Sequence, residues 1–258
     1  MWPILLRIGE FTLRTYGLFV AIGVLLAYNY VRYQGYKRRN IDTLFLSNLL
    51  FYTILVGFLG GRLLYVLLNF DYYKTEPLSI IKFWEGGLVF YGGFITGLLF
   101  GVIYTLIHKK NLFDITDICA PGLFLGLSIG RLGCFSAGCC YGKPTESFLG
   151  VVFSHPESLA PIGIKIYPTQ LFESVYAFVI FLISHYLLVK DKFRYKIFFI
   201  SGILYSVFRF INEFFRGDDR GPFLFGILSP SQVISIIIFI LFFGLIFCIS
   251  KWTKRSSK

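Results

Sequence analysis

Six charged residues lie inside or at the edges of long apolar runs. They are Arg62, Arg131, Glu173, Arg209, Glu213 and Arg216. A charge at the centre of a bilayer costs about 2.5 to 3.5 kcal/mol even on the lenient insertion scale, so such residues usually face a polar cavity. Any one of them could instead pair with another or extend to the membrane surface. The group as a whole favours a polar site.

Two sets of these residues have helical spacing. Arg209, Glu213 and Arg216 are four and three residues apart, and Gln170 precedes Glu173 by three, so each set is expected on one helix face. An arginine carries five donors in a planar fork that fits a phosphate. In a membrane the obvious phosphate is a phospholipid head group. The residue types therefore predict an outward-opening polar chamber for an anionic lipid, without specifying a reaction.

Apolar segments must position this chamber. The 258 residues are 56% hydrophobic and 15% charged, with a mean hydropathy of +0.70, whereas soluble domains are about a quarter charged. A hydrocarbon core about 30 Å thick needs roughly 20 apolar residues per helix. Seven such runs occur, at 16–33, 44–68, 88–107, 115–133, 168–189, 197–215 and 233–250. The predicted fold is all-α: one polytopic domain over 1–258 with about seven transmembrane helices.

Basic residues next to the runs indicate the orientation. Four clusters lie on one side of a seven-span chain: Arg32, Lys37, Arg38 and Arg39; Lys109 and Lys110; Lys190, Lys192, Arg194 and Lys196; Lys251, Lys254, Arg255 and Lys258. That side is expected to be cytoplasmic. The N-terminus and the segments 69–87, 134–167 and 216–230 would lie outside, with 134–167 forming a small extracytoplasmic head. The net charge of +11 then reflects orientation, and no nucleic-acid partner is expected.

The cysteines form two groups. Cys119 and Cys248 lie in apolar runs, as packing residues do. Cys134, Cys139 and Cys140 lie within seven residues at the predicted outer boundary. Three interpretations stay open for them: a disulfide between Cys134 and one of the others, packing, or a catalytic thiol. The three histidines have no ligand spacing, so no metal site and no cofactor are expected.

Seven short motifs resemble those of the prolipoprotein diacylglyceryl transferases, in the same order over nearly the whole chain. They are Arg14-Thr15-Tyr16-Gly17-Leu18; Gly60-Gly61-Arg62; Trp84-Glu85-Gly86-Gly87 with Tyr91-Gly92-Gly93; 126–133, ending in Gly130-Arg131-Leu132-Gly133; Pro168-Thr169-Gln170-Leu171-Phe172-Glu173; 208–216; and 229–235 with Gln232. Each motif alone is weak evidence, but seven in register strongly indicate the family.

The resemblance implies a multi-pass enzyme of the bacterial cytoplasmic (inner) membrane. It would transfer a diacylglyceryl group from phosphatidylglycerol to the thiol of the lipobox cysteine of a prolipoprotein, the first step of lipoprotein maturation. A thiol with a pKa near 8.5 needs a base or a positive field to ionise, and the departing phosphate needs its charge stabilised.

The matching motifs also imply the roles of individual residues. Arg131 and Arg209 would grip the lipid phosphate, Tyr16 would lie near the reacting head group, and Tyr91 would occupy the position of a base. The predicted lipid-binding residues are Arg131, Arg216, Glu213, Gln170, Glu173 and Arg62.

Two departures from the family pattern matter. Tyr91 stands where the family usually has a histidine, and tyrosine, with a pKa near 10, is a poorer base at neutral pH. After Gly133 the family has asparagine and glutamate where this chain has cysteines. A divergent transferase is the expected function; the alternatives are a lipid-binding or lipid-moving protein without transferase activity, and a thiol redox protein, which would leave the arginines unexplained.

Overall fold

The computed structural model describes residues 2–9, 11–82, 86–219 and 227–256. Trp84, Glu85 and Lys258, which entered the sequence predictions, lie outside the described residues. Within these ranges the chain is mostly helical, with seven helices of 17 to 27 residues and two small sheets. It divides into two compact units: unit 1 is Met1–Val31 with Thr116–Lys258, and unit 2 is Arg32–Ile115.

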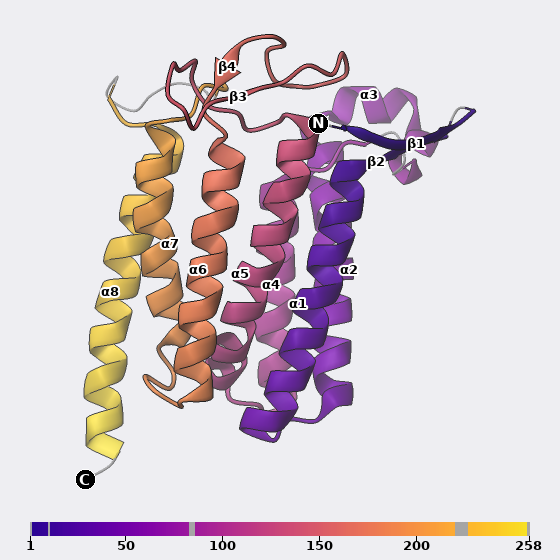
Figure 1. Cartoon of the computed structure of the whole chain (residues 1–258). Coiled ribbons are helices and arrows are strands. Elements are labelled where there is room, and N and C mark those ends of the chain that lie inside the picture. Colours follow the sequence, from indigo (N-terminus) through magenta and orange to yellow (C-terminus); the bar gives the residue numbers. More distant parts are fainter. Residues whose placement is uncertain (1, 10, 83–85, 220–226, 257–258) are drawn as a thin grey trace. The chain divides into compact units, whose positions relative to one another are not determined.

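Unit 1 contains an N-terminal hairpin, a short head and most of the long helices. Its elements are β1 (Ile4–Ile8), β2 (Phe11–Arg14), the first part of α1 (Thr15–Arg39), most of α5 (Leu112–Ala137), β3 (Val151–Val152), β4 (Lys165–Ile166), α6 (Thr169–Val189), α7 (Ile197–Glu213) and α8 (Pro230–Ser256). Helices α5 to α8 run side by side, with β3 and β4 at one end and the end of α8 at the other (Figure 1).

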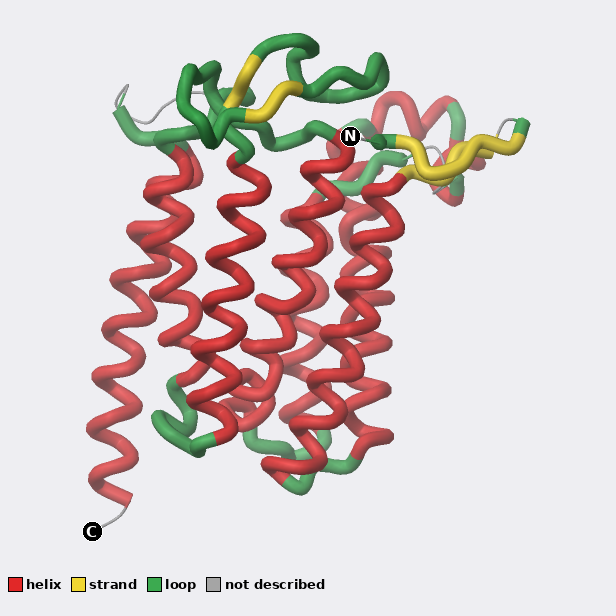
Figure 2. Tube along the Cα trace, viewed as in Figure 1, coloured by secondary structure: helices red, strands yellow, loops and turns green. Residues whose placement is uncertain are grey.

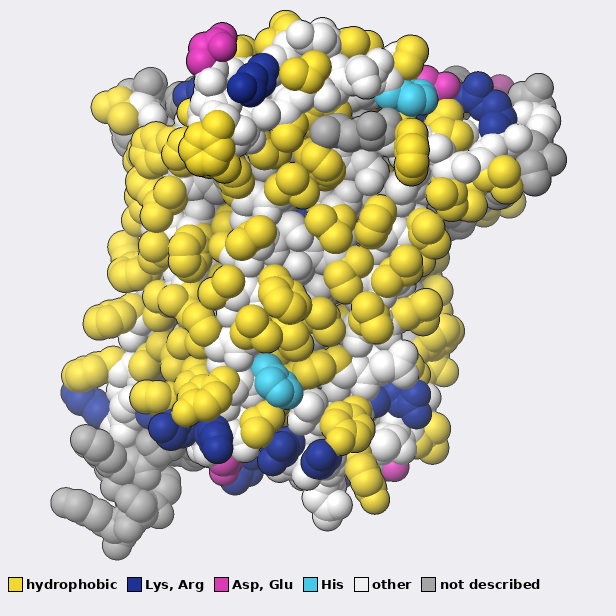
Figure 3. Space-filling view, in the orientation of Figure 1, with side chains coloured by type: hydrophobic (Ala, Val, Ile, Leu, Met, Phe, Trp, Pro, Cys, Tyr) yellow, Lys and Arg dark blue, Asp and Glu magenta, His cyan; other side chains and the backbone are white. Residues whose placement is uncertain are grey.

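Each predicted span coincides with a long helix. The largest shifts are at the ends of α1 and α8, which continue to Arg39 and Ser256. Among the described residues, five helices are long and apolar enough to cross a membrane: α2 (Thr43–Leu68), α4 (Phe90–Ile107), α5, α6 and α8. Helix α1 is less apolar because it includes Asn29 and Arg32, and α7 has 17 residues. Hydrophobic side chains cover the helices of unit 1 (Figure 3).

Polar and apolar contacts hold α5 against α6. The Ser128 hydroxyl donates to the Ser174 carbonyl at 2.9 Å, and the Ser174 hydroxyl donates to the Ser128 carbonyl at 2.8 Å. Phe124 of α5 packs in one buried cluster with Ala177 and Ile180 of α6. Both hydroxyls are buried and satisfied, so this contact fixes the register in which α5 presents its last turns to α6.

Glycines bring two helix pairs into backbone contact. A Cβ on Gly23 of α1 would lie 2.8 Å from the carbonyl oxygen of Gly126 in α5. In unit 2, a Cβ on Gly93 of α4 would lie 2.8 Å from the carbonyl oxygen of Gly57 in α2. Small residues allow such packing between membrane helices. These glycines therefore serve close approach of the helices.

The head begins later than predicted. Helix α5 continues to Ala137, so Cys134 lies in its last turn and the non-helical head covers 138–168, not 134–167 (Figure 2). Strands β3 and β4 pair antiparallel over a small core of Phe153, Ala160 and Ile166. This strand pairing was not predicted, because two-residue strands leave no periodic signal in the sequence.

Candidate active site

Arg131 and Glu173 form a buried ion pair between α5 and α6. Their Nη2 and Oε1 atoms are 2.9 Å apart, and the Glu173 side chain has no exposed surface. The Tyr205 hydroxyl of α7 donates to the same Oε1 at 2.8 Å. Three helices therefore converge on one carboxylate. Within the described residues, Arg131 Nε and Glu173 Oε2 are buried and have no hydrogen-bond partner.

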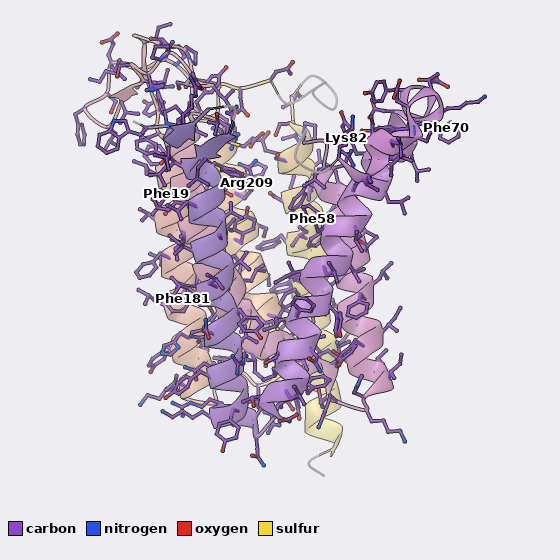
Figure 4. All side chains as sticks on the ribbon, turned by 90° about the vertical axis from the view of Figure 1, so that its right-hand side faces the viewer. Phe19, Phe58, Phe70, Lys82, Phe181 and Arg209 are labelled. Atoms are coloured by element: carbon purple, nitrogen blue, oxygen red, sulfur yellow. The ribbon has the colours of Figure 1, made fainter. Side chains whose placement is uncertain are left out.

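Arg209 forms a second pair one helix away. Its Nη2 lies 3.0 Å from Oε2 of Glu213 and donates to the Ser231 hydroxyl of α8 at 3.1 Å. The Glu173 carboxylate also acts electrostatically on Arg209, so the two pairs belong to one cluster. Figure 4 places Arg209 nearer than Phe181 to the end of unit 1 that carries the head.

Arg216 does not share the helix face of Arg209 and Glu213, so that prediction was wrong. Helix α7 ends at Glu213, and Arg216 follows in a turn that forms a β-bridge with Gly142 of the head. Its guanidinium instead donates to both carboxylate oxygens of Asp218, at 2.9 and 2.7 Å. The helical spacing failed here because backbone pairing with the head replaces the last helical turn.

The three arginines share one property. Each is paired with a carboxylate, and each keeps one buried nitrogen without a hydrogen-bond partner in the described part of the chain: Arg131 Nε, Arg209 Nη1 and Arg216 Nη1. A buried donor without a partner costs about 1 to 3 kcal/mol. The three pairs carry no net charge. The cluster would therefore bind an anion through directional hydrogen-bond donors rather than through a large positive charge.

Gln170 and Tyr16, also predicted site residues, border this cluster. Gln170 is fully buried and donates to the carbonyl of Cys139 at 2.7 Å, which holds the head against the start of α6. Tyr16 is partly exposed at the start of α1, and its backbone lies against Gly133 of α5. It interacts electrostatically with Arg131. Both residues are thus in unit 1, as are Arg131 and Arg209.

Arg62 and Tyr91 belong to unit 2. The buried Arg62 guanidinium donates to five backbone carbonyl oxygens, those of Ser79, Ile80, Lys82, Gly86 and Gly87. These five hydrogen bonds hold the connection between α2 and α4. They favour a structural role for Arg62 over the predicted lipid contact. Tyr91 lies in the first turn of α4, where its ring is exposed and packs edge-on against Phe90.

Comparison with known proteins identifies the family. A family model described as prolipoprotein diacylglyceryl transferase matches residues 3–248. The chain belongs to this family. A relative from Clostridium perfringens (strain 13 / Type A), named phosphatidylglycerol–prolipoprotein diacylglyceryl transferase 2, is 38% identical over 227 residues, 88% of this chain and 87% of its own. A transferase of the same name without the number, from Clostridium tetani (strain Massachusetts / E88), is 34% identical over 259 residues, 99% of this chain and 100% of its own.

The family resemblance inferred from the motifs is therefore confirmed. A further diacylglyceryl transferase, from Xanthomonas campestris pv. campestris (strain B100), is 34% identical over 255 residues, which cover 91% of this chain and 86% of the relative. These relatives cover nearly the whole chain, so the family assignment applies to the arginine cluster and the head together.

The three cysteines that depart from the family pattern lie together. Cys134, Cys139 and Cys140 are free thiols, and their sulfur atoms lie within 4.8 Å of one another. Hydrogen bonds with the Cys134 and Cys139 thiols, with the positive charges of Arg216 and Arg131, lower the pKa of the Cys140 thiol. Hydrogen bonds with the Cys134 and Cys140 thiols raise the pKa of the Cys139 thiol.

Three contributors to the site were not identified from the sequence. Tyr205 precedes Arg209 by four residues, so helical spacing would have found it on the same face. Asp218 follows Arg216 by two residues in the segment 216–230, which was predicted only to lie outside the membrane, so its pairing with Arg216 was not predicted. Ser231 lies in the motif 229–235, but a serine at the start of an apolar helix usually serves as a cap, so its contact with Arg209 was not predicted.

Proposed function

We propose that this protein transfers a diacylglyceryl group from phosphatidylglycerol to the lipobox cysteine thiol of a prolipoprotein. The thiolate sulfur attacks the glycerol carbon that carries the phosphate, the carbon–sulfur bond forms, and glycerol phosphate leaves as the carbon–oxygen bond breaks. The phosphate changes from a singly charged diester towards a doubly charged monoester. Stabilising that developing charge is the main electrostatic task of the site.

The observation that carries this proposal is the set of three buried guanidinium nitrogens without partners, on Arg131, Arg209 and Arg216. A lipid phosphate would supply the acceptor oxygens that the described residues do not. The paired carboxylates Glu173, Glu213 and Asp218 hold the guanidinium groups in place before the lipid arrives. Such preorganisation reduces the reorganisation that the transition state requires.

The proposal includes a topology. Seven helices would span the bacterial inner membrane as a single domain, with the N-terminus and the head outside and the C-terminus in the cytoplasm. Five helices are apolar and long enough by themselves. The basic connection from Lys190 to Lys196 lies at the opposite end of unit 1 from the head (Figure 1). Labelling of single cysteines from each side tests this topology; a head inaccessible from outside would contradict it.

Transfer itself is tested with purified protein in liposomes that contain phosphatidylglycerol, with a lipobox peptide as acceptor. The expected product is a peptide with the added mass of a diacylglyceryl group. A peptide with serine in place of the acceptor cysteine, and liposomes of phosphatidylcholine alone, are the matched controls. Saturable binding of phosphatidylglycerol without any modified peptide would instead support a lipid-binding or lipid-moving protein.

A further inference from the structure

The end of α5 gathers three cysteine sulfur atoms at the spacing of a metal site. Cys134, Cys139 and Cys140 have Sγ atoms that all lie within 4.8 Å of one another, and no disulfide joins them. Zinc–thiolate bonds are about 2.3 Å long, so sulfur ligands of one ion lie about 3.8 Å apart. The three sulfur atoms need to approach by only about 1 Å to bind a single ion.

The backbone holds these cysteines in position. Gly138 ends α5 with a φ of +80°, and its N–H donates to the Cys134 carbonyl at 2.9 Å. Cys140 has a φ of +61°, which few residues other than glycine adopt. The chain therefore reverses and returns two cysteines to the last turn of α5. Thr169 and Gln170 of α6 fix this reversal by donating to the carbonyls of Cys140 and Cys139, each at 2.7 Å.

The donor set is soft and incomplete. Thiolates select zinc-class and copper(I) ions over hard cations. Among the described residues the group has three members, whereas structural zinc sites use four protein ligands and catalytic sites leave one position open. Cys134 is buried, while Cys139 and Cys140 are half-buried. A fourth ligand can therefore come from outside the chain.

The cluster also lies beside the arginine site. Arg131 Nη1 is 3.9 Å from the Cys134 sulfur. Three thiolates with one divalent ion carry a net charge of −1, and the Arg131 guanidinium, which is also paired with Glu173, lies beside the Cys134 sulfur. An acceptor sulfur bound to the ion would thus lie next to the guanidinium proposed to hold the lipid phosphate.

We propose that Cys134, Cys139 and Cys140 bind one zinc-class ion whose open position takes the acceptor thiol as a thiolate. The inference rests on the proposed transferase function and adds the means of activating its acceptor. A metal-bound thiol loses its proton at neutral pH, and here that proton goes to solvent. The sulfur lone pair then forms the carbon–sulfur bond, and the carbon–oxygen electron pair departs with glycerol phosphate. Nothing is oxidised or reduced.

This role accounts for both departures from the family pattern. A metal-bound thiolate needs no histidine base, which fits a tyrosine at position 91. A catalytic cysteine that accepted the lipid itself would form a stable thioether, which is a poor leaving group and would end turnover. A disulfide would use two of the three sulfur atoms and leave the third without a function.

Metal binding is measured on the reduced full-length protein after removal of metal with a chelator. Titration with Zn²⁺ should show one ion per chain, and Cd²⁺ should give ultraviolet thiolate-to-metal absorption. Cys139→Ser and Cys140→Ser, both at half-buried positions, should abolish stoichiometric binding, while Cys248→Ser on α8 should not change it. Thermal melting checks that each variant is folded. If the folded Cys140→Ser variant binds one Zn²⁺ per chain as the unsubstituted protein does, the proposed metal site is wrong.

A lipobox peptide then tests the open position. The peptide should raise the Cd²⁺–thiolate absorption from the value expected for three thiolate ligands to that for four. A peptide with serine at the acceptor position should leave the absorption unchanged. Removing the metal should slow transfer more than about tenfold, and Zn²⁺ should restore it. Full-rate transfer by metal-free protein, or a disulfide within the cluster of the active protein, refutes the metal site and leaves the transferase intact. Absence of transfer with and without metal refutes the transferase, while the Cd²⁺ titration still decides the site.

Discussion

Arg131 and Glu173 offer a way to separate the fold from the chemistry. From sequence alone, removing Arg131 would be expected to relieve an insertion cost, because a charge leaves the membrane. The structure predicts the opposite, since Glu173 is fully buried and would lose its cation. Arg131→Met keeps an unbranched apolar side chain as far as the position of Nε and removes the guanidinium head with its charge and donors.

The size of the effect follows from the burial of the pair. Removing one partner of a buried ion pair costs about 3 to 5 kcal/mol, because the remaining charge is uncompensated. At about 2 to 4 °C per kcal/mol for a chain of this size, the melting temperature should fall by roughly 10 °C. Adding Glu173→Gln removes the stranded charge and keeps an acceptor for the Tyr205 hydroxyl. Most of the lost stability should return.

The assay compares melting temperature in detergent with the rate of lipid transfer in liposomes for the single and double variants. Arg131→Met should lose both stability and transfer, whereas Arg131→Met/Glu173→Gln should regain stability but not transfer. Arg131→Lys should keep part of the stability and little of the transfer, because an ammonium lacks the planar fork. Recovery of transfer together with stability in the double variant would show that Arg131 only supports the fold.

Three further substitutions test separate parts of the account. Gly130→Ala adds a methyl group in open space beside Arg131, so the variant should keep or raise the stability of the protein. If lipid fills that space, the same variant should slow transfer; an unchanged rate of transfer would show that lipid does not occupy it. Arg62→Lys removes most of the hydrogen bonds from Arg62 to backbone carbonyl oxygens and should lower the melting temperature. A higher KM for phosphatidylglycerol with an unchanged melting temperature would instead support contact between Arg62 and the lipid. Tyr91→Phe should slow transfer about tenfold to a hundredfold if the Tyr91 hydroxyl donates a hydrogen bond to a charged lipid oxygen, and an unchanged rate would exclude that role.

The helices and the arginines could be predicted because both follow from the contrast between apolar and charged residues along the chain. Long apolar runs have one stable form in a bilayer, and a charge within such a run stands out. The sequence therefore located the seven long helices closely and identified Arg131, Glu173, Arg209 and Glu213 as a group. It also placed Cys134, Cys139 and Cys140 near one boundary.

The remaining features depend on where helices end. Helical spacing assigned Arg216 to the face of Arg209, but backbone pairing with Gly142 ends α7 at Glu213 and directs Arg216 to Asp218. The approach of the three sulfur atoms depends on positive φ angles at Gly138 and Cys140. Such a reversal leaves little trace in the sequence, because cysteine does not usually mark a left-handed turn.

In the proposed reaction the arginines stabilise a departing phosphate while the diacylglyceryl group moves to sulfur. Phosphatidylglycerol with one isotope in the head-group glycerol and another in the diacylglyceryl glycerol tests this directly. The diacylglyceryl label should appear in the peptide as a thioether, with an equal amount of head-group label released as glycerol phosphate. Head-group label on the peptide, or a peptide carrying only a fatty acyl thioester, would contradict it.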